Sequence, residues 1–195
     1  MDRLHLLGLK QHWIYEVLVS TYCHGTPHAA PVGVWAEGLD ELHMDVFDGS
    51  RTLATIREGG DFVVNFPAGA EMLYAAQRAP ERLAFAAARC VQAPIVAGCT
   101  ATVELATRSV TPDGDKVRIV GEVKHLNHAE APRLINRAEG LLLESLILAT
   151  RLERGDRGAA LTTLTENHRV VSKVAPGSVY ARAMTALLQD LDATS

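Results

Sequence analysis

The sequence predicts a mainly β fold with α-helices (α+β), in which a β-barrel body at residues 1–127 precedes a helical C-terminal region at residues 128–195. Before residue 127, runs of β-branched and aromatic residues are separated by breaks that contain Gly or Pro, a pattern typical of strands. After Pro132, apolar residues recur at helical spacing over longer segments. A chain of 195 residues with 48% hydrophobic residues is long enough to bury one core.

Three strands are expected near the start of the chain. Residues 12–22 are β-branched, aromatic and apolar on both sides apart from Glu16, which suits the wall of a barrel. A turn at residues 23–27 leads into a second strand at residues 28–35, whose small residues permit close approach by another group. A third strand is expected at residues 41–47.

A helix is expected directly after the third strand. Residues 48–50 form a break, and residues 51–58 have apolar positions at helical spacing with Ser50 as the candidate N-cap. Gly59 and Gly60 are expected to end this helix, and a strand follows at residues 61–66.

The segment that follows combines helices with a hairpin. Residues 67–88 are rich in Ala, Leu, Glu and Arg, which favours helices. Apolar and polar residues alternate over residues 101–108 and again over residues 116–125, with the turn expected at residues 111–114. This pattern predicts an antiparallel hairpin.

Three helices are expected after Pro132, at residues 134–152, after Gly158 and at residues 178–191. We expect this region to pack on the barrel or at a dimer interface. The first helix is too apolar on too many sides for a lone surface helix, which indicates a homodimer.

Three charged residues of that first helix, Arg137, Glu144 and Arg151, recur at intervals of seven and therefore share one helix face. Their neighbours are rich in leucine, and buried charges must pair. Two interpretations stay open: an ion-pair ladder that joins the helix to the barrel or to another subunit, and a substrate-binding role.

Charge and cysteine usage exclude several classes of protein. The net charge of −4, without a long run of Lys or Arg, argues against nucleic acid or an anionic membrane as a partner. Cys23, Cys90 and Cys99 show no C-x-x-C spacing, so the pattern indicates neither a disulfide framework nor a zinc site. The histidine pairs His24/His28 and His125/His128 lack a nearby cluster of Cys or carboxylates, and no metal is predicted.

Targeting signals are also absent from the sequence pattern. The first residues lack the apolar run and cleavage site of a signal peptide. The most apolar stretch, residues 141–149, carries Glu144 and is too short to span a bilayer. We therefore expect a cytoplasmic protein without a membrane partner.

The motif Gly49-Ser50-Arg51-Thr52 is a candidate phosphate site. A helix start supplies free backbone N–H groups and the positive end of the helix dipole. Gly49 lets the backbone come close, Ser50 and Thr52 can donate from their hydroxyls, and Arg51 can make a bidentate contact with phosphate oxygens. Taken alone, such a motif is more often an ordinary helix cap.

The order strand, break, helix and strand, followed by residues 62–66, resembles the flavin-reductase-like branch of the FMN-binding split barrels. More closely, the chain resembles one uncharacterised family of that superfamily, which is also related to pyridoxamine-phosphate-oxidase-like proteins. The motifs that carry this resemblance are Ile14-Tyr15-Glu16-Val17, the run from Gly25 to Val34, Gly49-Ser50-Arg51-Thr52, Val64-Asn65-Phe66, Asn136-Arg137-Ala138, Glu144 and Ala149-Thr150-Arg151-Leu152.

The resemblance implies a dimeric FMN-binding split β-barrel with FMN as the cofactor. It implies that the flavin ring lies against the strand containing Ala30, Pro31, Val32 and Gly33, and that the phosphate lies at Ser50, Arg51 and Thr52. Asn65 either contacts the flavin or ties down neighbouring backbone. The resemblance also implies a link to tetrahydromethanopterin-dependent one-carbon metabolism.

The leading functional hypothesis is an FMN-dependent oxidoreductase that acts on an unidentified small molecule with an unidentified electron donor. The flavin would perform the redox chemistry, so no catalytic triad is required. The alternative is a non-catalytic flavin-binding or flavin-carrying module. A pyridoxamine-phosphate oxidase is disfavoured because the chain lacks extra basic residues for a substrate phosphate, and haem or a deazaflavin in the same barrel stays open.

Overall fold

The computed structural model describes residues 4–128, 132–150, 152 and 157–193. Contacts divide the chain into two compact units. The barrel unit comprises Met1–Gln11 and Tyr15–Ile135, and the helical unit comprises His12–Ile14 and Asn136–Ser195. Each unit has its own buried core and is described separately.

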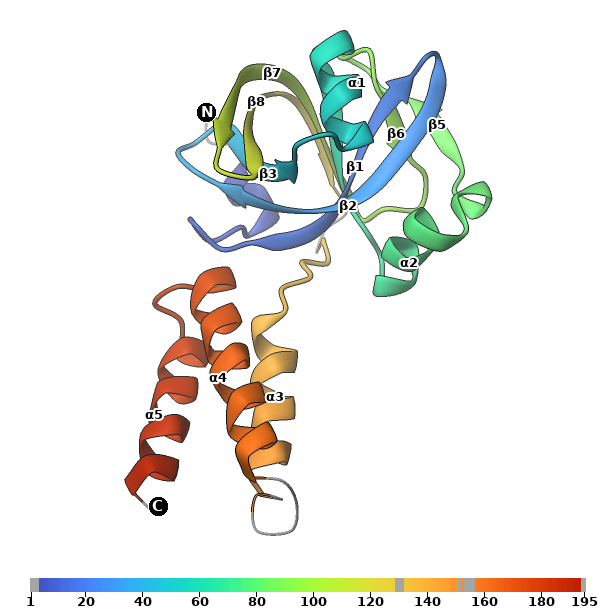
Figure 1. Cartoon of the computed structure of the whole chain (residues 1–195). Helices are drawn as coiled ribbons and strands as arrows, with labels where there is room; N and C mark the ends of the chain where they lie inside the picture. The colour runs from blue at the N-terminus through green and yellow to red at the C-terminus, as the bar shows by residue number, and fades with distance from the viewer. Residues whose placement is uncertain (1–3, 129–131, 151, 153–156, 194–195) are drawn as a thin grey trace. The chain divides into compact units, whose positions relative to one another are not determined.

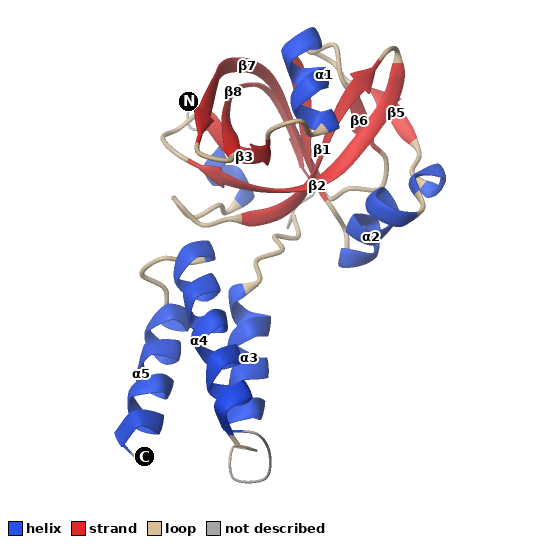
Figure 2. Cartoon of the chain, viewed as in Figure 1, coloured by secondary structure: helices blue, strands red, loops and turns tan. Residues whose placement is uncertain are grey.

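The barrel unit is a closed barrel with the strand order β1-β2-β3-β8-β7-β4, in which all neighbours are antiparallel (Figure 1). A short 3₁₀ helix, η1 (Leu4–Leu7), precedes it. The strands, red in Figure 2, are β1 (Tyr15–Cys23), β2 (Thr26–Ala36), β3 (Glu41–Phe47), β4 (Asp61–Phe66), β7 (Ala101–Asp113) and β8 (Lys116–His128). The predicted α+β fold with a barrel and C-terminal helices is therefore confirmed.

The strand β3 shows how the barrel wall separates its core face from its outer face. Leu42, Met44 and Val46 are buried, at 2%, 1% and 6% exposure. Successive side chains of a strand point to opposite faces, so Asp45 and Phe47 lie on the outer face. Phe47 is 63% exposed, which leaves a large apolar ring at the edge of this face.

The helix α1 (Arg51–Gly59) begins and ends as predicted. The Ser50 Oγ accepts a hydrogen bond from the Leu53 N–H at 3.3 Å, which caps the helix. Gly60 ends the helix at φ 75°, a conformation that favours glycine. On the buried side, the hydroxyls of Thr55 and Thr21 lie 2.8 Å apart and tie the helix to β1.

The segment after β4 differs from the prediction. Residues 67–88 contain the expected helix α2 (Ala70–Arg78) and the 3₁₀ helix η2 (Pro80–Arg82), but Phe85–Ala87 is a strand, β5. It pairs with β6 (Pro94–Val96), which the sequence did not reveal. Pairing with β6 supplies the backbone partners that override the helix propensity of the two alanines of β5.

The long hairpin of β7 and β8 turns later than predicted. The expected turn at residues 111–114 falls partly inside β7, because Thr111 pairs with Arg118 and Pro112 with Val117. The strands pair up to Asp113 and Lys116, so the turn contains Gly114 and Asp115. Gly114 has a φ of 64°, which places the positive-φ residue of the turn there.

The helical unit contains the three expected helices, α3 (Ala138–Ala149), α4 (Arg157–Val174) and α5 (Val179–Ala193). They bury Ala138, Val171, Val174, Ala175 and Met184 in a common core. The helix α3 begins later than predicted, at Ala138, whose N–H donates to the Asn136 Oδ1 at 2.8 Å. The Asn136 Nδ2 donates to the carbonyls of Ile14 and Val174, each at 2.8 Å.

Within the described part of this chain the predicted charge stripe is not buried, and its pairing with another subunit stays a prediction. Arg137 precedes α3, and both Arg137 and Glu144 are exposed, while Arg151 lies outside the described residues. Two leucines near Glu144 are also exposed, Leu143 at 57% and Leu146 at 46%. Glu144 is therefore not a buried ion-pair partner within this chain. None of the described helices is both long and apolar enough to cross a membrane.

Candidate functional site

A pocket of about 280 Å³ lies on the outer face of β2 and β3, next to the start of α1. The predicted site residues that line it are Ala30, Pro31, Val32, Gly33, Ser50 and Thr52. The first four follow one another on β2, and the last two flank the first residue of the helix. Its volume is near the lower end of the range for small-molecule sites, roughly 300 Å³. We call it the β2–β3 pocket.

The helix start makes one end of this pocket suited to an anion. The Ala54 N–H donates to the Ser50 carbonyl at 3.1 Å, and the Leu53 N–H is capped by the Ser50 hydroxyl. The N–H groups of Arg51 and Thr52 precede these bonds and lie at the positive end of the helix dipole. Because the Ser50 oxygen accepts in its capping bond, its O–H is still able to donate.

Gly49 lets the chain reverse into this helix. Its φ of 79° lies in the left-handed region that favours glycine. The Gly49 N–H donates to Asp48 Oδ1 at 3.1 Å, and the Ser50 N–H donates to the Phe47 carbonyl at 3.1 Å. These bonds form a tight connection between β3 and α1, which brings the outer face of β3 against the helix start.

Arg51 belongs to a different pocket. Its exposed side chain lines a second cavity, of about 480 Å³, together with His24 and His28. Burial lowers the pKa of His28, and the positive charge of Arg51 lowers that pKa further. The structure therefore does not bring the Arg51 guanidinium into the β2–β3 pocket with Ser50 and Thr52, although the backbone N–H of Arg51 lies at the helix start.

Asn65 is also outside the β2–β3 pocket. It is fully buried, at 0% exposure, and its Nδ2 donates to the Leu18 carbonyl at 3.0 Å and the Ser20 Oγ at 2.8 Å. The Asn65 Oδ1 accepts a hydrogen bond from the Val96 N–H at 2.8 Å. Two roles were considered for Asn65, and these contacts match the second, in which it holds neighbouring backbone in place. They join β4 to β1 and β6.

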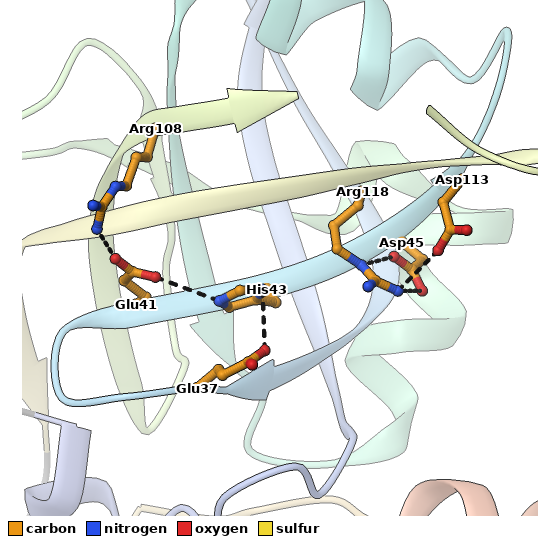
Figure 3. A network of polar contacts seen from close by, with 7 residues as sticks. All are labelled: Glu37, Glu41, His43, Asp45, Arg108, Asp113 and Arg118. Carbon is orange, nitrogen blue, oxygen red and sulfur yellow. Dashed lines mark hydrogen bonds and ion pairs between the residues drawn. The ribbon is translucent and has the colours of Figure 1, made fainter. Parts of the chain in front are cut away.

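The sequence did not identify the β3 residues of the pocket, which are Asp45, Val46 and Phe47. Asp45 accepts two hydrogen bonds from Arg118, from Nε at 2.9 Å and from Nη2 at 3.1 Å (Figure 3). These bonds raise the pKa of Arg118, whose guanidinium also lies 5.1 Å from the centre of the Trp35 ring. The sequence predicted a strand at residues 41–47 but did not indicate that its side chains line a pocket with β2.

A larger cavity, of about 600 Å³, lies farther along the same strands and is acidic. Its lining includes His43, which lies between two glutamates, with Nδ1 3.5 Å from Glu37 and Nε2 3.6 Å from Glu41 (Figure 3). Glu41 also pairs with Arg108. Several carboxylates repel a phosphate there, whereas the one carboxylate of the β2–β3 pocket, Asp45, is paired with Arg118. The smaller pocket is therefore the better candidate for an anionic cofactor. No group of three metal-binding side chains occurs among the described residues.

Comparisons with known proteins agree with this fold. The family model described as "Protein of unknown function (DUF447) N-terminal domain" matches residues 15–129. An FMN-bound protein from Methanosarcina mazei, whose description carries the same family name, has 18% identity and a TM-score of 0.57. The alignment covers 95% of this chain and 98% of that protein.

Two further solved structures resemble the barrel. A homologue of nitrilotriacetate monooxygenase component B from Mycobacterium thermoresistibile has 21% identity and a TM-score of 0.55, over 69% of this chain and 82% of its own. Flavoredoxin from Methanosarcina acetivorans has 19% identity and a TM-score of 0.53, over 62% and 74%. At these identities the likeness establishes a shared fold.

Proposed function

Because this chain belongs to the DUF447 family of proteins of unknown function, we propose that it binds FMN in the β2–β3 pocket and uses the flavin as a redox cofactor. One observation carries the proposal: a helix start with free N–H groups, two hydroxyls and a wall of small residues meet in a single pocket. The FMN-bound relative from Methanosarcina mazei, which aligns along most of the chain, supports the choice of flavin.

The phosphate of FMN would lie at the start of α1. Its oxygens would accept hydrogen bonds from the N–H groups of Arg51 and Thr52 and from the hydroxyls of Ser50 and Thr52. Hydrogen bonds to a charged acceptor each contribute about 1.5–3 kcal/mol. Arg51 would therefore act on the phosphate through its backbone and through the field of its charge.

The isoalloxazine ring would lie along β2 at Ala30–Gly33, where short side chains allow a flat ring to approach the backbone. Asp45 and Phe47 would face the ring from β3. Two hydrogen bonds from Arg118 hold the Asp45 carboxylate, so this carboxylate would have a fixed position beside the ring. When bound, FMN supplies the electron-transfer chemistry, and the chain supplies position and electrostatics.

A direct test is to titrate the apoprotein with FMN and follow the fluorescence of the flavin. Thr52→Val removes one hydroxyl at nearly constant volume and is expected to weaken FMN binding by about tenfold to hundredfold. Thr162→Val is the matched control, because Thr162 is an exposed threonine of α4, in the helical unit. Equal affinities for all three proteins would contradict the proposed phosphate site.

Catalysis is the second part of the proposal. As an oxidoreductase, the FMN-loaded protein would oxidise a reduced nicotinamide or another donor and pass the electrons to a small molecule. The alternative, a flavin carrier, predicts FMN binding without turnover. Anaerobic reduction of the bound flavin by NADH or NADPH distinguishes the two, and reoxidation by tetrahydromethanopterin derivatives tests the proposed place in cytoplasmic one-carbon metabolism.

We extend the proposal to a homodimer. On α3, Leu143, Leu146 and Ile147 are 57%, 46% and 38% exposed, which is unusual for a helix surrounded by water. A second copy of the chain would cover this face. Sedimentation should give twice the mass of 21.0 kDa, and Leu143→Glu combined with Leu146→Glu should give the monomer. A monomeric wild-type protein would contradict this part.

A further inference from the structure

The second cavity of the barrel unit, of about 480 Å³, lies between the turn that joins β1 to β2, the start of α1 and the η2 segment. It shares no lining residue with the β2–β3 pocket. One wall carries His24, His28 and Arg51, and another carries Pro80, Leu83 and Phe85. We call it the histidine pocket.

The basic wall is assembled from separate elements. His24 belongs to the turn after β1, His28 to β2, and Arg51 to the first turn of α1. Arg51 lies close enough to His28 for its charge to act on that imidazole. No carboxylate belongs to the described lining of the cavity, in contrast to the acidic cavity around His43.

His24 enters the lining of the cavity from a tight turn. The turn between Cys23 and Thr26 has two residues, and both His24 and Gly25 have positive φ, at 49° and 78°. Turns of this kind favour Asn or Asp followed by Gly, and histidine is, with Asn and Asp, among the non-glycine residues that adopt positive φ most often. The turn therefore accommodates a histidine at this position, and His24 is part of the cavity lining.

The lining also contains apolar side chains. Pro80, Leu83 and Phe85 belong to it, and Leu83 and Phe85 also pack against the cluster of Leu18, Ala29 and Val96. Such side chains offer a surface to the body of an organic molecule but contribute no group that binds a small inorganic anion. The cavity therefore has a cationic end and an apolar side, within a volume suited to a small organic ligand.

We propose that the histidine pocket binds a second small molecule, distinct from FMN, that carries a phosphate on an apolar body. A phosphate matches this wall because its three oxygens accept hydrogen bonds from the guanidinium of Arg51 and from two imidazoles. The Ser50 and Thr52 side chains line the neighbouring pocket, so the two sites have no lining residue in common. The proposal does not depend on FMN binding.

The test is calorimetric titration of the full-length protein, with and without saturating FMN, using phenyl phosphate as the probe. Phenol lacks the phosphate, inorganic phosphate lacks the apolar body, and benzoate replaces the phosphate by a carboxylate. Phenyl phosphate should bind at least tenfold more tightly than each of these three compounds. Binding of all four with equal affinity would overturn the proposal.

Two histidine variants separate this pocket from the flavin site. His24→Asn keeps a residue that tolerates positive φ, and His28→Asn keeps a polar side chain of smaller size. Each should weaken the binding of phenyl phosphate by about tenfold without changing FMN affinity.

Arg51→Gln tests the arginine of the pocket, and Arg57→Gln is its matched control. Arg57 is an exposed arginine of the same helix that is not part of the pocket lining.

The expected order is that Arg51→Gln weakens phenyl phosphate more than either histidine variant does, and that Arg57→Gln has no effect. Displacement of bound FMN by phenyl phosphate would overturn the proposal, because the cavity would then be part of the flavin phosphate site. Unchanged phenyl phosphate affinity in all the pocket variants would overturn it as well. Failure of FMN to bind, with phenyl phosphate binding as described, would contradict only the proposed flavin function.

Discussion

The β2–β3 pocket and the histidine pocket lie on either side of one residue, Arg51, but offer an anion different chemistry. The first presents backbone N–H groups and hydroxyls beside short side chains of β2. The second presents an arginine and two histidines opposite apolar side chains. Successive residues of a helix point about 100° apart, so a single helix start can serve two sites. A motif of adjacent residues therefore does not identify a single ligand.

The largest expected effect concerns the flavin itself. FMN should bind at least about a hundredfold more tightly than riboflavin, because the phosphate gains several charge-assisted hydrogen bonds and the helix dipole. Competition between the two flavins for the apoprotein measures the ratio. Equal affinity would mean that residues 49–52 only cap a helix, and that the β2–β3 pocket lacks the anion site assigned to it.

The next effect distinguishes a structural role in the barrel from a role in the β2–β3 pocket. Asn65→Ala should lower the free energy of unfolding by about 3 kcal/mol, because it leaves the buried Val96 N–H without its acceptor and removes the bonds to Leu18 and Ser20. Chemical denaturation measures this loss. The FMN affinity of the folded variant should equal that of the wild type. A loss of FMN binding with normal stability would instead indicate that Asn65 contacts the flavin.

A substitution at the helix cap tests the anion site without removing the cap. Asp and Asn both cap helices well, so Ser50→Asp and Ser50→Asn should melt close to the wild type. Only the aspartate carries a negative charge beside the proposed phosphate, and it should weaken FMN by a further tenfold or more relative to the asparagine variant. Similar FMN affinities for the two variants would place the phosphate elsewhere.

Most of the barrel could be predicted from the sequence because its signals are local. The strands β3 and β4 follow from their β-branched and apolar residues, and α1 follows from the Ser50 cap and the Gly60 stop. The sheet of β5 and β6 was missed since each strand has three residues and an alanine-rich sequence favours a helix. Only pairing across the chain makes these segments strands.

Part of the candidate pocket could be predicted for the same reason. The predicted residues form two local groups, Ala30–Gly33 on β2 and Ser50 with Thr52 at one helix start. Both groups line the same pocket. Asp45 and Phe47 were missed because strand alternation gives their face but not their neighbour strand. Two further features depend on tertiary packing that no local pattern encodes. They are the direction of the Arg51 side chain and the hydrogen bonds that occupy the amide group of Asn65.

The smallest expected effect is the pH dependence contributed by His28. Burial, and then the charge of Arg51, lower its pKa in the folded protein below the ordinary value of about 6.5. Near pH 6 the unfolded chain therefore binds more protons at this position, so stability falls as the pH falls through about 6.5 toward the folded pKa.

His28→Asn should show a smaller drop in melting temperature than the wild type between pH 7.5 and 5.5. Phenyl phosphate should reduce the drop in the wild type, because a bound anion favours the protonated imidazole. Identical pH profiles for the two proteins, with and without the anion, would contradict both the lowered pKa of His28 in the folded protein and its place beside the bound anion.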